Sequence, residues 1–435
     1  MALPKIQPKQ IAILLVVLVV LVGIFFLVRS GRRPTPPPIV ALSIWGTEPK
    51  PAFDKLLESY GQVRPNVQVA YREIDARDYE RAVLDALAAG QGPDLVMVPN
   101  TSLPRVRNRL QPLDPLQNAS LNLLQFRSAF PDVVESDLVL DQKIYALPLY
   151  LDTLALFYNR DLFNQAGIVN PPATWDDFLA LVPSLRKLEG ADRVVQAAAA
   201  LGGSERSVAD APDILQLLML QNGTAMINRD RTQAIFATPQ AGGESPGLAA
   251  LNFYLQFSQP AAPSYTWTET QGYSLDKFAT GEVAMLIDYR SRLRSVRAKN
   301  QFLAVNAAPV PQVAGSDRAV NLARYSALAV TKQSKTSGWA WDFAIYATTN
   351  RDAARQFSLA AGYPPALRSL IADALNQPEF VVFAKQALTA QTWYQADDSR
   401  ARSALNGAIA GVLSGQSTIE RALKIAQDQV TETMH

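Results

Sequence analysis

The longest apolar stretch of the chain lies near its amino terminus. Residues 11–28 read IAILLVVLVVLVGIFFLV, eighteen positions without a charge or a strongly polar side chain. A helix of this length, with one further residue, reaches about the 30 Å thickness of a bilayer's hydrocarbon core. A cleaved signal peptide has a shorter apolar run and small residues at its cleavage site. The pattern therefore predicts an uncleaved membrane anchor over residues 1–33, with a transmembrane helix of about residues 10–28.

A proline-rich segment follows this anchor. Residues 34–38 read PTPPP, a composition that favours the extended polyproline conformation and predicts a semi-rigid spacer. Two lysines and the amino terminus precede the apolar run, and three arginines follow it. Because positive charge is nearly equal on the two sides, the positive-inside rule leaves the orientation of the anchor open.

Beyond the spacer, the apolar positions alternate between two periods. Residues 39–45 and 94–98 are short apolar runs rich in strand-forming side chains. The apolar residues within 53–60 and 79–87 recur at intervals of three and four, which predicts helices, and those within 67–71 alternate, which predicts a strand. The order strand, helix, strand, helix, strand predicts a parallel α/β sheet with right-handed crossovers.

The same mixture of elements continues towards the carboxyl terminus. Thr174, followed three residues later by the acid Asp177, predicts the start of a helix. Residues 274–281 are expected to form a short helix that ends at a glycine, and residues 283–287 the strand after it. From residue 339 onwards the chain is expected to be mostly helical.

Composition excludes several classes of function. With 435 residues the chain is long enough for two or three compact units. The near balance of 41 Lys+Arg and 39 Asp+Glu argues against a nucleic-acid partner. The absence of cysteine excludes disulfides, thiolate metal sites, cysteine nucleophiles and the lipid-bearing cysteine of bacterial lipoproteins. The single histidine is the last residue, so no catalytic or metal-binding histidine is expected. We expect neither a metal nor a cofactor.

Several short segments together resemble a known family. They are Ile44-Trp45-Gly46, GQGPDLV at 90–96, KIYALPLYLDTLALFYNRDLF at 143–163, AGI at 166–168, PPATWD at 171–176, Tyr265-Thr266-Trp267, FATGEVAM at 278–285 and AWDF at 340–343. In this order they resemble family 1 extracellular solute-binding proteins, the group that includes maltose-binding protein. The departure is the amino terminus, where bacterial members commonly carry a cleaved or lipid-modified signal; here the predicted anchor takes the place of the lipid.

The resemblance implies an α/β, two-lobed periplasmic-binding-protein-like fold (type II), which the transmembrane helix predicted from the apolar run would precede. Lobe 1 would use residues 39–149 and 309–345, and lobe 2 residues 150–308 and 346–435. The protein would be a monomer in the cell membrane, single-pass, with its globular part extracytoplasmic. Its partners would be a small-molecule ligand, expected to be a carbohydrate, and the transmembrane subunits of an ABC importer, served by closure of the two lobes.

Candidate ligand-binding residues follow from the rule that ligands of open α/β sheets lie beyond the carboxyl ends of the strands. Strand ends and the crossing between lobes supply Trp45, Gly46, Asn100, Thr101, Tyr150, Asp152, Asp288, Tyr289 and Arg290. The resemblance adds Trp267 and Trp393. Aromatic faces pack on the apolar face of a pyranose, and carboxylates and amides bind its hydroxyls, so this set suits a sugar.

Each of these residue types also has a purely structural interpretation. A tryptophan that ends a buried strand, as Trp45 does, is often part of the core, and Asp152 can cap a turn. Arg290 belongs to a run with three further arginines up to residue 297, a pattern typical of a solvated face. If that run faced the cleft instead, an anionic ligand would be expected.

Three alternatives in function remain open at this stage. A receptor that senses its ligand for a signalling partner would have the same sequence features, and the same fold could bind a polyamine, a phosphorylated polyol or a peptide. A surface carbohydrate-active enzyme would need paired carboxylates, such as Asp141 with Asp152 or Glu269 with Glu282. No nucleophile elbow or phosphate loop is present, so we expect no catalytic residue and no enzyme activity.

Overall fold

The computed structural model describes residues 8–30, 38–114, 116, 120–190, 192–240, 243 and 245–434. The chain forms two compact units, Met1–Val40 and Ala41–His435. The first seven residues of the expected anchor, its last three and most of the expected spacer lie outside the described residues, as does the terminal histidine.

The first unit contains one long helix, α1 (Pro8–Ser30), which includes the apolar run near the amino terminus. Its described apolar side chains are exposed, for example Leu18 at 58% and Val19 at 67%. Within the described residues, no helix is found that is both long and apolar enough to cross a membrane.

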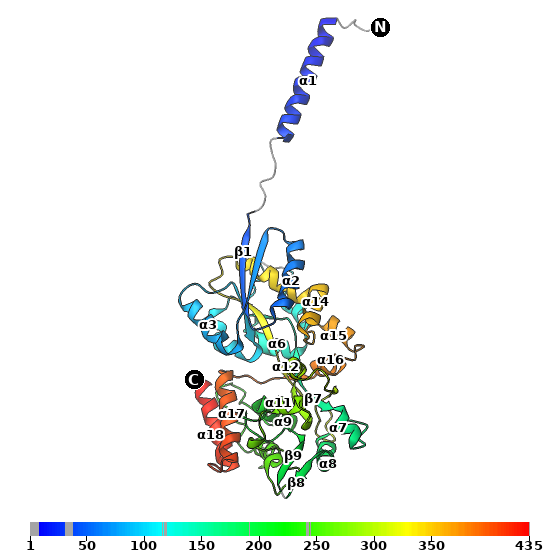
Figure 1. The fold of residues 1–435 in the computed structure, drawn as a ribbon. Coiled ribbons are helices and arrows are strands. Elements are labelled where there is room, and N and C mark those ends of the chain that lie inside the picture. The colour runs from blue at the N-terminus through cyan, green and yellow to red at the C-terminus, as the bar shows by residue number, and fades with distance from the viewer. Residues whose placement is uncertain are drawn as a thin grey trace. The chain divides into compact units, whose positions relative to one another are not determined.

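The second unit has two lobes, each built on its own sheet (Figure 1). In the described part of lobe 1 five strands lie in the order β2-β1-β3-β13-β6. Their bounds are β1 Val40–Gly46, β2 Val67–Glu73, β3 Leu95–Pro99, β6 Leu147–Pro148 and β13 Ser326–Val330. Strand β1 runs parallel to β3, and β13 is antiparallel to β3 and to β6. The strand and helix order predicted for residues 39–98 is confirmed.

Helices cover this sheet because their apolar faces need partners. They are α2 Lys50–Val63, α3 Ala76–Ala88, η1 Asn100–Ser102, α4 Leu103–Val106, η2 Arg107–Arg109, α5 Leu123–Ala129, α6 Asp132–Leu138, α13 Ser337–Thr349, α14 Arg351–Ala361 and α15 Arg368–Ala374. Phe53 of α2 stacks on Tyr71 at a centroid distance of 3.7 Å and meets the edge of Phe357 from α14 at 5.5 Å. After α6 the chain forms a short antiparallel hairpin of two strands with two residues each, β4 (Val139–Leu140) and β5 (Lys143–Ile144).

Lobe 2 is built on a seven-stranded sheet of the order β14-β12-β7-β10-β9-β8, with β11 also paired to β7. The described strands are β7 Asp152–Asn159, β8 Lys187–Glu189, β9 Arg193–Ala199, β10 Val283–Tyr289, β11 Val305–Ala308, β12 Asn321–Arg324 and β14 Ala390–Gln391. The central pair, β7 and β10, is buried along almost its whole length, as expected for strands covered by helices on both faces.

The helices of lobe 2 surround this central pair (Figure 1). They are α7 Arg160–Gln165, α8 Trp175–Leu185, α9 Ala211–Gln221, α10 Pro246–Leu255, η3 Gln256–Ser258, η4 Glu269–Gln271, α11 Ser274–Ala279, η5 Arg290–Arg292, α12 Leu293–Lys299, α16 Val381–Ala387, α17 Asp398–Leu413, α18 Ile419–Thr431 and η6 Glu432–Met434. The predicted helix start at Thr174 is confirmed, since Thr174 and Asp177 cap each other's backbone N–H groups.

The chain passes between the lobes at closely spaced points. Strands β12 and β13 are separated by Tyr325 alone, and β6 and β7 by three residues. The expected boundaries placed residues 309–345 in lobe 1 and 346–435 in lobe 2, whereas β12 pairs with β7 and α14 packs on α2. One reason for the difference is that β6–β7 and β12–β13 form a two-stranded ribbon whose two ends belong to different sheets. The other is that an amphipathic helix pattern does not indicate which sheet the helix will cover.

Candidate functional site

A groove with three connected parts runs between the two lobes. The deep pocket, of about 50 Å³, is lined by Asn100, Thr101, Asp213, Gln216, Tyr289, Leu322, Ala323, Arg324, Thr392, Gln395, Asp398 and Arg402. The middle pocket, of about 350 Å³, shares Asn100, Thr101, Thr392 and Gln395 with it. The outer pocket, of about 660 Å³, shares Pro104, Ser136, Leu140, Arg231 and Tyr394 with the middle one. The shared walls make the three pockets one groove.

Four of the predicted residues line this groove. Asn100 and Thr101 begin η1 directly after β3, so the end of a buried strand presents them, as the strand-end rule predicts. Tyr289 ends β10 and donates its hydroxyl to Asp213 at 2.9 Å. Trp393 lines the middle pocket with only 8% of its surface exposed, and its indole N–H donates to Gln216 Oε1 at 2.7 Å.

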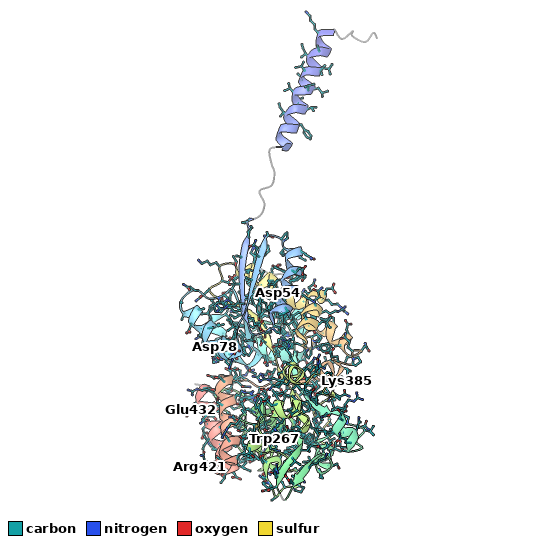
Figure 2. The ribbon with its side chains drawn as sticks, viewed as in Figure 1. Asp54, Asp78, Trp267, Lys385, Arg421 and Glu432 are labelled. Atoms are coloured by element: carbon teal, nitrogen blue, oxygen red, sulfur yellow. The ribbon has the colours of Figure 1, made fainter. Side chains whose placement is uncertain are left out.

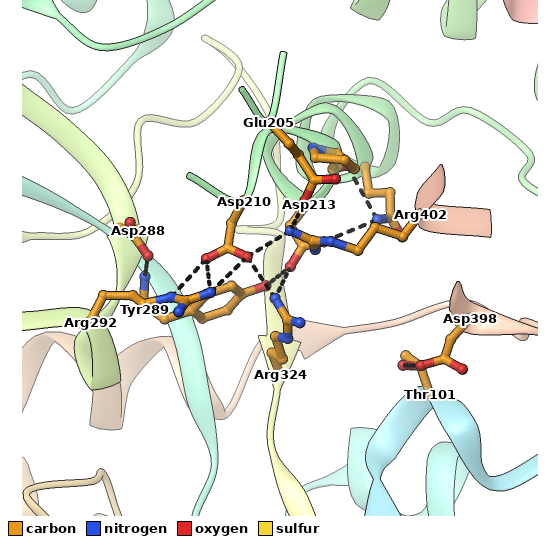
Figure 3. A network of polar contacts seen from close by, with 12 residues as sticks. Thr101, Glu205, Asp210, Asp213, Asp288, Tyr289, Arg292, Arg324, Asp398 and Arg402 are labelled. Atoms are coloured by element: carbon orange, nitrogen blue, oxygen red, sulfur yellow. Dashed lines mark hydrogen bonds and ion pairs between the residues drawn. The ribbon is translucent and has the colours of Figure 1, made fainter. Parts of the chain in front are cut away.

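A charge network built on two buried carboxylates lies at the lobe 2 wall of the deep pocket, where Asp213, Arg324 and Arg402 line the pocket (Figure 3). At its centre the Asp210 carboxylate, whose side chain is 0% exposed, accepts hydrogen bonds from Arg324 at 2.7 Å, Arg402 at 2.8 Å and Arg292 at 3.2 Å. Asp213 accepts from Arg324 at 3.0 Å and also from Arg402. We call these five residues the arginine–aspartate network.

The electrostatics of this network follow from burial and charge together. Burial alone would raise the pKa of Asp210, but the positive charges of Arg324, Arg292 and Arg402 outweigh it and hold that pKa below its usual range. Burial and then the negative charge of Asp210 raise the pKa of the neighbouring Asp288 well above its ordinary value. The three guanidinium groups of the network face its two carboxylates and that of Glu205, which also pairs with Arg402, so their positive charge is met within the protein.

A second set of polar contacts joins the lobes across the groove. Asp398, in the first turn of α17, accepts a hydrogen bond from Ser102 Oγ at 2.6 Å and lies 3.5 Å from the guanidinium of Arg105. Asp137 of α6 accepts from Asn100 at 2.8 Å, from Tyr325 at 2.8 Å and from Thr392 of lobe 2. Burial raises the pKa of Asp137 to about 6. The contacts of Asp398 with Ser102 and of Asp137 with Thr392 therefore join the two lobes directly.

A model of the family described as bacterial extracellular solute-binding protein matches residues 55–380. The chain belongs to this family. A binding protein of Brucella abortus strain 2308 is 25% identical over 268 residues, and the match spans 60% of each chain. The chain thus covers less than two thirds of that relative.

Solved structures share the fold of this solute-binding protein. A solute-binding protein of Thermotoga lettingae, solved with α-D-tagatose bound, has a TM-score of 0.73 and 20% identity, with 91% of this chain and 100% of that chain covered. The sugar-binding protein MalE of Xanthomonas citri has a TM-score of 0.72 and 21% identity, with 91% and 97% covered. The two-lobed α/β fold expected from the sequence is confirmed, and the proteins matched are binding proteins.

Seven other predicted residues of the solute-binding protein lie outside the groove walls. Asp152 begins β7 and accepts the backbone N–H groups of Arg290 at 3.2 Å and Ser291 at 2.9 Å, so its carboxylate holds the start of η5. Burial raises the pKa of Asp152 to about 6. Arg290 itself lies over the Phe380 ring at 4.5 Å and pairs with Glu379. Asp288, also buried, accepts the backbone N–H of Tyr289 at 2.7 Å.

The remaining four of these residues lie at two other places. In lobe 1, the Trp45 ring lies 4.7 Å from the guanidinium of Arg72, and Gly46 packs so closely that an added Cβ would lie 2.7 Å from Met97. The Tyr150 hydroxyl donates to a buried glutamate, Glu48, at 3.4 Å. Trp267 is buried within lobe 2 (Figure 2), beside a separate pocket of about 560 Å³.

The arginine–aspartate network was not predicted from the sequence. Asp210 is followed by a proline in the first turn of α9, a usual sign of a helix start, which could have located the carboxylate. Nothing in the sequence pairs it with its arginines, which lie 82, 114 and 192 residues away. Of the predicted arginine run, Arg292 joins the network, whereas Arg294 donates to the Ala361 carbonyl at 2.8 Å.

No group of three or more acidic or histidine side chains arranged to hold a metal ion is found among the described residues. The donors and acceptors along the groove are mostly amides, hydroxyls and carboxylates, with indole and phenol rings between them. This lining can hold a polar, uncharged molecule by hydrogen bonds and ring contacts.

Proposed function

We propose that this solute-binding protein captures a sugar or oligosaccharide in the groove between its lobes and delivers it to an ABC importer. The observation that carries the proposal is the groove lining, where the rings of Trp393, Tyr289 and Tyr394 lie together with uncharged amide and hydroxyl side chains such as Gln395 and Thr101. An aromatic ring covers the apolar face of a pyranose, and an amide binds two neighbouring hydroxyls.

The charge of the groove favours a neutral ligand. Arg324 and Arg402 both line the deep pocket, yet each already makes ion pairs with Asp210 and Asp213. An anion would have to compete with these carboxylates, whereas a hydroxyl can donate to a carboxylate and accept from a guanidinium without displacing either. Related structures were solved with tagatose, maltotetraose, mannobiose and mannotriose bound, which supports the same ligand class.

Capture by closure is part of the proposal. Ligand held between the lobes would add to the contacts that Asp398 and Asp137 make across the groove, and so would populate the closed form. The importer would then recognise the closed form, as the family resemblance implies.

Calorimetry on the full chain tests the ligand class, in a detergent whose headgroup is not a sugar. The panel contains tagatose, maltotetraose, mannobiose and mannotriose, with spermidine and glucose 6-phosphate as charged competitors. We expect one neutral sugar to bind with a Kd on the order of micromolar and the charged compounds not to bind. Tight binding of either charged compound, with no sugar bound, would overturn the proposal.

Two matched tryptophan variants test the place of binding. Trp393→Phe removes the indole N–H that donates to Gln216 and narrows the ring in the middle pocket, so sugar affinity should fall about tenfold. Trp267→Phe loses a comparable hydrogen bond, to Ser207 at 3.2 Å, but lies beside the separate pocket and should leave affinity unchanged. The reverse outcome would move the site to that pocket.

We further propose that the region around α1 anchors the protein in the cell membrane with the globular unit outside. The support is the eighteen-residue uncharged run and the helix that contains it. The full chain should stay in the membrane fraction after an alkaline carbonate wash, a chain without residues 1–38 should not, and protease added to intact spheroplasts should digest the globular unit. Release of the full chain by the wash would contradict the anchor.

A further inference from the structure

Backbone strain is concentrated along the groove. Among the described residues, four that are not glycine have positive φ: Asp141 at 50°, Gln142 at 59°, Asp210 at 51° and Arg231 at 57°. Asp210 is the centre of the arginine–aspartate network, and the other three all line the outer pocket. Such conformations are unfavourable for residues with a Cβ and persist where the surroundings impose them, often at ligand-binding sites.

The strain in lobe 1 lies at the tip of the β4–β5 hairpin. Leu140 pairs with Lys143, so Asp141 and Gln142 form a two-residue turn with positive φ at both positions. This turn type favours an aspartate or asparagine followed by glycine. Glutamine in the second position keeps an exposed amide at the rim of the outer pocket, at a cost that glycine would remove.

Arg231, the strained residue that lobe 2 contributes to the outer pocket, lies in a loop on the other side of this pocket from the hairpin. Asn228 holds the loop, since its side chain bonds to the Thr232 hydroxyl at 2.9 Å and to the Thr232 backbone N–H at 2.9 Å. Arg231 is thereby fixed with its guanidinium 5.0 Å from the centre of the Tyr394 ring. Tyr394 lines both the middle and the outer pocket, so its ring continues the groove outward from Trp393.

The charges of the outer pocket are compensated by neighbours. Its three carboxylates each have an arginine partner: Asp132 with Arg368 at 2.6 Å, Glu135 with Arg127 at 2.7 Å and Asp141 with Arg107 at 3.5 Å. No carboxylate of the described residues pairs with Arg231. The pocket thus offers an amide, a ring and one guanidinium to a ligand, without a large net field of either sign.

The volumes indicate how far a ligand must extend. Small-molecule sites enclose about 300–1,000 Å³. The deep pocket, at about 50 Å³, is below this range, whereas the middle and outer pockets, at about 350 and 660 Å³, are within it. A ligand that filled the groove would therefore have most of its mass in the middle and outer pockets.

We propose that the outer pocket is a second binding subsite, which takes the distal units of a neutral oligosaccharide of three or more sugars. Gln142 and Arg231 would bind hydroxyls of these units from opposite lobes, and Tyr394 would carry a ring face. This inference rests on the proposed function and assigns the chain length of its ligand. Gln142 and Arg231 both line the outer pocket, so a ligand that extends into this pocket gains contacts with both lobes. A disaccharide held in the middle pocket would not reach both of them.

Substitution by glycine at positions 142 and 231 should change ligand affinity without changing the stability of the fold. Gln142→Gly and Arg231→Gly remove the side chain and relieve the strained φ, while glycine adds entropy to the unfolded chain. The melting temperature should therefore stay within about 2 °C of the wild type. Arg229→Ala is the matched control, since Arg229 is exposed in the same loop but does not line the outer pocket.

The experiment is calorimetry on the full chain with malto- and manno-oligosaccharides of one to four units. The wild type should bind the tri- or tetrasaccharide of its preferred series about tenfold or more tightly than the disaccharide. Each glycine variant should lose about fivefold to tenfold in affinity for the longer sugars only, and Arg229→Ala should lose none.

The possible outcomes test the outer subsite and the proposed sugar-binding function separately. No binding of any sugar by the wild type overturns the proposed function. Binding that is independent of length, or variants that weaken all lengths equally, overturns the subsite and leaves the function in place. Glycine variants that bind sugars of every length with wild-type affinity overturn the subsite as well.

Discussion

Replacing the carboxylate at the centre of the arginine–aspartate network is the sharpest test of how lobe 2 is held together. Asp210→Asn keeps the size of the side chain, and asparagine tolerates the positive φ of 51°, so the backbone is not newly strained. The substitution removes one negative charge from contact with three guanidinium groups. It also turns an amide N–H towards groups that can only donate hydrogen bonds.

The size of the effect follows from burial. Removing one partner of a buried ion pair costs about 3–5 kcal/mol. Asp210 is fully buried, but the side chains of Arg292 and Arg324 are each 45% exposed, so water compensates part of their charge and the lower end, about 3 kcal/mol, applies. If the whole second unit, of about 400 residues, unfolds together, the melting temperature falls by about 4 °C; if lobe 2 unfolds alone, it falls by about 7 °C.

Differential scanning calorimetry at pH 7 measures this shift. Asp54→Asn is the control, because Asp54 and Lys50 form an exposed ion pair whose loss should change the melting temperature by less than about 1 °C. Because the pKa of Asp210 is lowered in the folded protein, its stabilisation is present above the unfolded value of about 3.9 and disappears as pH falls through the folded pKa. If the variant melts at the wild-type temperature at pH 7, Asp210 does not stabilise lobe 2 through its ion pairs.

Two further predictions concern Asp152 and Asp398. The pKa of Asp152 is raised to about 6, so the folded protein binds this proton more tightly than the unfolded chain does. The free energy of unfolding, measured in urea, should therefore increase as pH falls from about 6 to about 4. Asp152→Asn should make that increase smaller. An equally steep increase in the variant would contradict this assignment. Asp398→Asn weakens the contacts to Ser102 and Arg105, so the ligand-free protein should expand in X-ray scattering and bind sugar about fivefold more weakly. An unchanged scattering profile would show that these contacts do not maintain closure.

The fold could be predicted from local periodicity because its elements are locally encoded. The strands around 39–45 and 94–98, and the capped helix start at Thr174, appear where the apolar pattern and capping residues placed them. Residues at the ends of two strands, Asn100 and Tyr289, also line the groove, because a strand end fixes where the next side chain lies.

The rest of the site depends on long-range contacts that periodicity does not encode. The partners of Asp210 come from η5, β12 and α17, which only the finished fold brings together. Asp152 was predicted from the crossing between the lobes, yet its carboxylate is taken by backbone N–H groups of η5, and the amide of Asn100 is bonded to Asp137 and to the backbone N–H of Tyr325. A strand-end rule selects the region of a site but does not tell which polar group is left over for a ligand.

The paired ribbon between the lobes has a mechanical consequence. Strand β12 pairs with β7 on the lobe 2 side, β13 pairs with β6 on the lobe 1 side, and Tyr325 alone separates β12 from β13. Two hydrogen-bonded strands bend readily about an axis across the ribbon but resist sliding past each other, because sliding would break the register. The lobes are therefore confined to a nearly single path of approach, and a ligand that satisfies the groove walls would fix one distance between the lobes along that path.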